Sequence, residues 1–85
     1  MQLLRTERFK KDFQHLPADI QARAAQALER FVANPRHPSL QVKKMEGAPD
    51  IWELRVSDNY RVTSQRFSGG VLLRRIGTHN ILRHP

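Results

Sequence analysis

Two arginines and a histidine carry the clearest chemical signal in the sequence. Arg55 and Arg61 flank a short turn between two stretches that alternate apolar and polar residues, and His79 follows a third such stretch. Guanidinium groups match the geometry of phosphate oxygens, and histidine is the side-chain type that ionises near neutral pH. These residue types suit chemistry at a phosphate group, in which arginines bind negative charge and a histidine moves a proton.

The turn between residues 51–57 and 60–67 decides where the two arginines point. A two-residue turn would place Arg61 on the apolar face, whereas a three-residue loop of residues 57–59 pairs Arg55 with Arg61. Asn59 suits the left-handed conformation that such a loop uses at its last position. The three-residue loop also collects the apolar side chains on one face of the hairpin, namely Trp52, Leu54, Val56, Tyr60 and Val62. We therefore expect the register that opposes the two arginines.

Like charges directly opposite each other destabilise a sheet. The Arg55–Arg61 pair is tolerable if Glu53 screens it or if both side chains extend into solvent, and it is useful if an anion such as phosphate lies between them. His79 follows Gly77 at the end of residues 71–77, where it could face the arginines or be an ordinary exposed loop residue. Taken one residue at a time, the sequence does not decide whether the arginine pair binds an anion or is only solvated. Nor does it decide whether His79 is functional or an ordinary loop residue.

The remaining pattern predicts the elements that would hold these side chains. Residues 2–5 suit a short strand, and Thr6 suits the cap of a helix that ends near Pro17. A second helix with an Ala-rich apolar stripe continues to Asn34-Pro35. Residues 40–45 alternate loosely, and three clearer strands follow at 51–57, 60–67 and 71–77. The order β-α-α-β-β-β predicts a single α+β domain, residues 1–85, with a helical hairpin packed on a mostly antiparallel sheet.

The composition indicates which classes of partner the protein could bind. The chain has 15 Lys and Arg against 8 Asp and Glu, a formal net charge of +7, which favours nucleic acid, an anionic membrane or an acidic protein as partner. Cysteine is absent and the four histidines lack metal-ligand spacing, so we expect no metal and no cofactor. No apolar run approaches the roughly 18 residues of a membrane span, and no signal-peptide pattern opens the chain. We expect a cytoplasmic protein without a membrane partner.

One reaction fits a set of side chains that has arginines and a histidine but no metal site. In metal-independent RNA cleavage the ribose 2′-hydroxyl attacks the adjacent phosphorus, so the protein supplies no nucleophile. It supplies a base, an acid for the leaving 5′-oxygen, and cations for the charge on the phosphoryl oxygens. His79 could carry out one of the two proton transfers, as acid or as base, and Arg55 and Arg61 could supply the positive charge.

Several motifs together resemble the RelE/ParE superfamily of bacterial toxin–antitoxin toxins, in particular its RelE-type mRNA endonucleases. The resemblance covers nearly the whole chain, through "FKKDFQHLP", a helix ending in "NP", "HPSLQVKKMEG…IWELRVSDNYRV" and "RRIGTHNIL". It implies a toxin of a type II toxin–antitoxin system that enters the ribosomal A site and cuts mRNA there. It also implies three partners: a cognate antitoxin, mRNA with ribosomal RNA, and operator DNA bound through the antitoxin complex.

The resemblance also implies roles for individual residues. Arg61 matches the arginine that stabilises the phosphate, and His79 matches a position where several members carry a histidine acting as general acid or base. Arg55, Lys43 and Lys44 match a basic cluster that supports the reaction or holds ribosomal RNA. Further candidates for binding substrate or ribosomal RNA are Arg74, Arg75, Arg83 and Asn80, and we expect at least one of Arg74 and Arg75 on the face of Arg61.

One feature departs from the family. Some members place a tyrosine near the C-terminus, whereas no aromatic residue follows Phe67 here. The second proton-transfer group is therefore open, with Glu53, Lys43 and His84 as candidates in that order. Two other functions are open as well: a ParE-like toxin that inhibits DNA gyrase, and a noncatalytic basic module that binds nucleic acid or an antitoxin.

Overall fold

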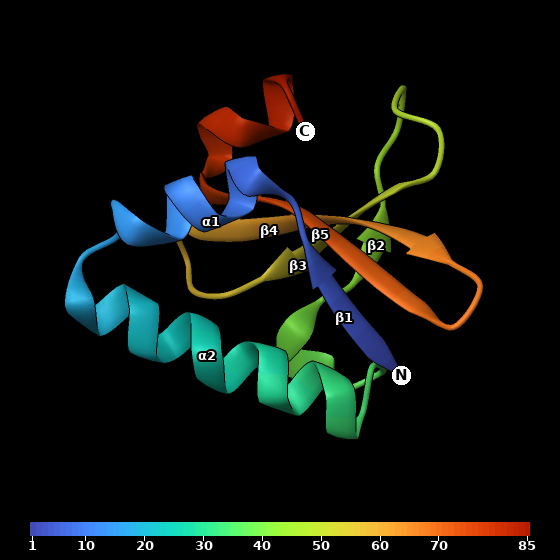
Figure 1. Ribbon diagram of the computed structural model, residues 1–85, viewed down its shortest axis with the longest axis horizontal. Helices are drawn as coiled ribbons and strands as arrows, with labels where there is room; N and C mark the ends of the chain where they lie inside the picture. The colour runs from blue at the N-terminus through green and yellow to red at the C-terminus, as the bar shows by residue number, and fades with distance from the viewer.

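Two helices follow the first strand, and the rest of the sheet follows the helices (Figure 1). The computed structural model describes residues 1–85. The elements in chain order are β1 (Gln2–Arg5), α1 (Glu7–Gln14), α2 (Ala18–Ala33), the 3-10 turn η1 (Pro38–Leu40), β2 (Lys43–Lys44), β3 (Ile51–Arg55), β4 (Tyr60–Phe67), β5 (Gly70–Thr78) and the 3-10 turn η2 (His79–Arg83). The predicted α+β class is confirmed. The order β-α-α-β-β-β has one strand fewer after the helices than the structure, in which β2 forms within the loosely alternating residues 40–45.

The strands form one five-stranded sheet in the order β1-β5-β4-β3-β2. β1 pairs with β5 in parallel, and every other pair is antiparallel. β1 ends at Arg5, opposite Leu73, so the second half of β5 has no strand on that side. α1 lies there instead: the carboxylate of Asp12 accepts a hydrogen bond from the main-chain N–H of Ile76 at 3.3 Å.

α2 begins and ends where the sequence predicts, and α1 begins after the predicted cap but ends at Gln14, before Leu16. Thr6 caps α1 by accepting a hydrogen bond from the N–H of Phe9 at 3.0 Å. Pro17 precedes α2, and Asn34 ends it. Neither helix is long and apolar enough to cross a membrane.

The hydrophobic core lies between α2 and one face of the sheet. α2 contributes Ala24, Ala27 and Phe31, and the small alanines let the helix approach the strands closely. The sheet contributes alternate residues of its central strands, including Leu54, Val62, Leu73 and Ile76. Residues of the other parity, among them Glu53, Arg55 and Arg61, therefore face away from this core. η2 contacts β4 and β5 on that far side (Figure 1).

The prediction of a strand over residues 40–45 is wrong for its first half. The Nδ1 atom of His37 accepts a hydrogen bond from the N–H of Ser39 at 3.2 Å, which stabilises a 3-10 turn instead. Gln41 then takes a left-handed conformation with φ of 45°. Only Lys43 and Lys44 remain to pair with β3.

Candidate functional site

The hairpin of β3 and β4 has the predicted register. Leu54 pairs with Val62, and Arg55 lies directly opposite Arg61. The N–H of Val56 donates to the carbonyl of Tyr60 at 3.0 Å, which closes a loop of residues 57–59. One detail of the prediction is wrong: among non-glycine residues only Gln41 and Asp50 have positive φ, so Asn59 is not left-handed. The three-residue loop forms without that conformation.

Arg61 is held by the loop and by a carboxylate. Its Nη1 donates to the main-chain carbonyls of Ser57 and Asp58 and, at 2.9 Å, to that of Tyr60. Its Nε lies 3.6 Å from Oε1 of Glu53, and only 13% of the Arg61 side chain is exposed. The remaining nitrogen, Nη2, makes no hydrogen bond within the protein and is the one that can bind an anion without breaking these contacts.

Carboxylates separate the like charges, as one of the sequence alternatives requires. Arg55 forms an ion pair with Asp58 in the loop. Glu53 interacts with Arg61 and also with Nζ of Lys43, at 3.8 Å. Lys43, Glu53 and Arg61 thus form a row across three adjacent strands, on the face away from α2. Lys44 pairs with Trp52 and belongs to the opposite face, so the structure does not bring it to this row.

His79 lies at the end of the sheet that carries the 57–59 loop. Gly77 is the β5 partner of Arg61, and Thr78 is the partner of Tyr60, so His79 follows directly beyond the paired residues. The side chain is exposed and lines a shallow cleft of about 460 Å³ with Asn59, Tyr60, Thr78 and Asn80. Arg61 does not line this cleft.

Arg74 and Arg75 are engaged by the protein itself. Register places Arg75 opposite Thr63, on the face of Arg61 as predicted, but its guanidinium forms a bidentate pair with Asp12 at 3.0 and 3.2 Å. The Nε of Arg74 donates to the main-chain oxygen of Pro85 at 3.1 Å, and its Nη1 donates to Gln65 at 2.9 Å. Arg75 therefore connects α1 to the sheet through Asp12, and Arg74 connects the C-terminal residue Pro85 to it. Arg83 lies in η2 and is exposed.

Sequence reasoning missed two arginines on α2. Arg23 and Arg30 line a polar cavity of about 320 Å³ together with Arg55 and the 57–59 loop. Their spacing of seven residues, which places both on one face of a helix, was the available signal. The structure contains no group of three or more His, Asp or Glu side chains placed to hold a metal ion.

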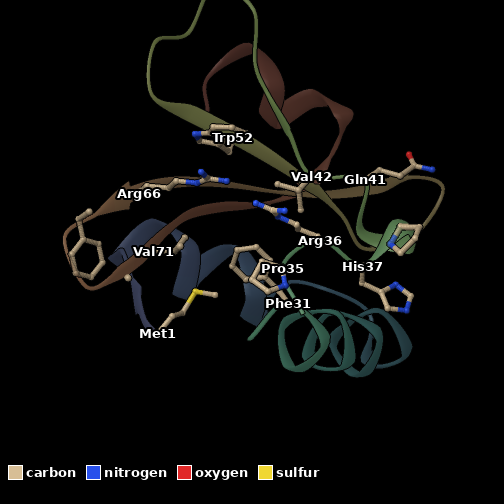
Figure 2. A pocket seen from close by; sticks show the side chains of 13 residues that line it. Met1, Phe31, Pro35, Arg36, His37, Gln41, Val42, Trp52, Arg66 and Val71 are labelled. Carbon is tan, nitrogen blue, oxygen red and sulfur yellow. The ribbon is translucent and has the colours of Figure 1, made fainter. Parts of the chain in front are cut away.

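A larger cavity lies elsewhere, between the end of α2 and the opposite end of the sheet. It has a volume of about 730 Å³, and its walls include Phe31, Val42 and Val71. Figure 2 shows Arg66 lying along the ring of Trp52 in this cavity, where the guanidinium carbon is 3.8 Å from the ring centroid. Trp52 is therefore on the core side of β3, as predicted, but it remains half-buried.

No protein-family model matches the sequence, and no curated protein does. Solved structures match at fold level. A chain of the RelB–RelE antitoxin–toxin complex from Methanococcus jannaschii has a TM-score of 0.76 at 22% identity, covering 95% of this chain and 95% of that one. YafQ from E. coli has a TM-score of 0.79 at 12% identity, covering 95% and 96%.

A chain of the intact RelBE toxin–antitoxin complex of E. coli is a third match, with a TM-score of 0.69 at 23% identity, covering 89% of this chain and 93% of that one. All three identities lie below the level at which sequence alone indicates shared chemistry, but the structures agree over nearly their full length. The chain thus has the RelE-type toxin fold, two helices packed on a five-stranded, mostly antiparallel sheet.

Proposed function

We propose that the protein is the toxin of a type II toxin–antitoxin system, a single domain over residues 1–85 that cuts mRNA on the ribosome without a metal ion. The observation that carries this proposal is Arg61. Its guanidinium is fixed by three carbonyls and Glu53, lies opposite Arg55, and keeps Nη2 free. A cation held in place before the reaction can stabilise developing phosphoryl charge at little reorganisation cost.

We assign each residue a role in the reaction from its position in the structure. The ribose 2′-hydroxyl attacks phosphorus and the bond to the 5′-oxygen breaks, leaving a 2′,3′-cyclic phosphate. Arg61 binds the nonbridging oxygens, and His79, exposed at the sheet end, donates a proton to the leaving 5′-oxygen. Glu53 lies beside Arg61 and is the best-placed group to accept the 2′-hydroxyl proton. Arg55 and Lys43 add positive charge around the phosphate.

The partners follow from the same proposal. The exposed basic side chains would contact mRNA and ribosomal RNA in the A site, in the cytoplasm. They include Lys44 and Arg83, and the amide of Asn80 would help to position substrate beside His79. The solved relatives named RelB–RelE and RelBE contain an antitoxin. We therefore assign a cognate antitoxin to this chain, with operator DNA bound through that complex.

A translating extract with a reporter mRNA tests the proposal. Wild-type protein should introduce cuts at defined codons, mapped by primer extension, and Arg61→Ala or His79→Ala should lose most of that cleavage while remaining folded. Lys10→Ala is the control, because Lys10 is an exposed cation of α1 outside the site. Wild-type protein that leaves ribosome-bound mRNA intact and traps gyrase on DNA would overturn the proposal in favour of a ParE-like toxin.

A further inference from the structure

A cavity lies between the middle of α2 and the loop that joins β3 to β4. Its volume is about 320 Å³. Three arginines line it: Arg23 and Arg30 from the helix, and Arg55 from the end of β3. The row of Lys43, Glu53 and Arg61 does not line it, so the cavity is distinct from the proposed catalytic face.

The two helix arginines are placed along one wall. Seven residues separate them, which is about 10 Å along a helix axis and nearly two full turns, so both point to the same side. The Nη1 of Arg30 donates to the hydroxyl of Ser39 at 2.9 Å, which orients that guanidinium. Both arginines are exposed and neither takes part in a salt bridge.

Positive charge exceeds negative charge at this cavity. The three arginines face a single carboxylate, that of Asp58, which already pairs with Arg55. The other walls are mainly polar, with only Ala27 and Val56 as apolar residues. A concave polar surface with excess guanidinium groups attracts an anion that can accept several N–H bonds at once, and phosphate fits this description best.

We propose that this cavity binds a backbone phosphate of the same RNA strand whose neighbouring phosphate is held at Arg61. Arg55 connects the two places. It lies opposite Arg61, where cross-strand neighbours have Cβ atoms about 5 Å apart, and it is also one of the residues that line the cavity, at the end of β3. The arginines thus form a track from the catalytic face over the loop to α2, as in surfaces that follow a nucleic-acid backbone.

The choice of RNA rests on the proposed function, and the cavity supports it over an acidic peptide. A peptide partner anchors through apolar or aromatic side chains in pockets, and this cavity offers little apolar wall. It contains no aromatic residue on which a base could stack. Its contact with RNA is therefore to phosphate, independent of sequence.

Fluorescence anisotropy on the full chain tests the site, with a short labelled single-stranded RNA that carries 2′-O-methyl groups and cannot be cut. The double variant Arg23→Gln with Arg30→Gln should bind about tenfold more weakly. Its salt dependence should fall by about 0.7 in log–log slope for each phosphate that the variant no longer neutralises. Arg23→Lys with Arg30→Lys keeps the charges and should stay within about threefold of wild type.

The matched control is Arg5→Gln with Lys10→Gln, which removes two exposed charges lining a different cavity, between α1 and α2. Equal loss of RNA binding in both charge-removing pairs would overturn the site, because the effect would then be general charge. The Arg23→Gln, Arg30→Gln variant would also overturn the site if it lost binding to polyglutamate while its RNA affinity stayed unchanged. The cavity would then bind an acidic peptide and not RNA. Because the probe cannot be cut and no ribosome is present, this result is separate from the cleavage assay: phosphate binding can succeed where mRNA cleavage fails.

Discussion

The guanidinium of Arg61 lies beside the carboxylate of Glu53, with Nε 3.6 Å from Oε1, and each side chain is only 13% exposed. Glu53 also faces Lys43, so one carboxylate offsets two cations on a sheet face where Arg55 and Arg61 are direct neighbours. This arrangement fixes the position of the Arg61 guanidinium, as the proposed role in binding phosphate requires. It also gives Glu53 a role in the stability of the fold.

Glu53→Gln should therefore lower the free energy of unfolding by about 1–2 kcal/mol. The expected loss is less than that for a fully buried ion pair, because the carbonyl contacts of Arg61 remain. For a chain of this length the change corresponds to a fall in Tm of roughly 4–16 °C. Glu29→Gln, an exposed change on α2, is the control and should stay within about 0.5 kcal/mol. Equal stability of the two variants in thermal unfolding would contradict the structural role of Glu53.

Asp12 has a second structural role, because it binds both the Arg75 guanidinium and the N–H of Ile76. Asp12→Asn should destabilise the chain by about 2 kcal/mol, since charge-assisted hydrogen bonds are worth more than neutral ones. Denaturant unfolding measures this change, with Asp19→Asn at an exposed position as control. Arg75→Ala should cost little more once Asp12 is changed. A silent Asp12→Asn variant would contradict this role and return Arg75 to the residues free to bind RNA.

Sequence patterning predicts the local parts of this structure well. The bounds of β1 and β4, the Thr6 cap and the Arg55–Arg61 register all follow from alternation, capping and turn length, which act over a few residues. The parallel pairing of β1 with β5 joins distant segments, and nothing in the strand of residues 2–5 specifies that partner.

The misplaced or missed residues have physical reasons too. A register shift between Thr63 and Ser64 offsets the pairing of β4 with β5. Alternation alone therefore cannot assign Arg74 and Arg75 to faces, and their partners within the protein lie far away in the sequence. Arg23 and Arg30 resemble an ordinary solvated helix face until the fold brings Arg55 and the loop against them.

Gly77 determines how η2, and with it His79, meets the sheet. A Cβ atom at this position would lie 2.8 Å from Cγ2 of Ile81, which is itself buried. Gly77→Ala should therefore displace η2 and cost about 1–3 kcal/mol, the usual range for overpacking. It should also reduce mRNA cleavage, because His79 is the first residue of η2.

A double-mutant cycle with Ile81→Ala separates this contact from other effects of the glycine. Removing the Ile81 side chain should make Gly77→Ala less costly, with a coupling energy of about 1 kcal/mol in thermal unfolding. Additive losses would show that the two positions do not meet as described.

The chemical end left on the cut mRNA shows whether the ribose 2′-hydroxyl is the nucleophile. Fragments from ribosome-bound mRNA treated with wild-type protein should carry a 2′,3′-cyclic phosphate, and a 2′-O-methyl group at the scissile nucleotide should abolish the cut. His79→Ala and Arg61→Ala should each reduce the cleavage rate by about a hundredfold or more, the scale on which acid–base and electrostatic groups contribute. Fragments ending in a 3′-hydroxyl, or cleavage that survives 2′-O-methylation, would contradict attack by the ribose hydroxyl and the roles assigned to these residues.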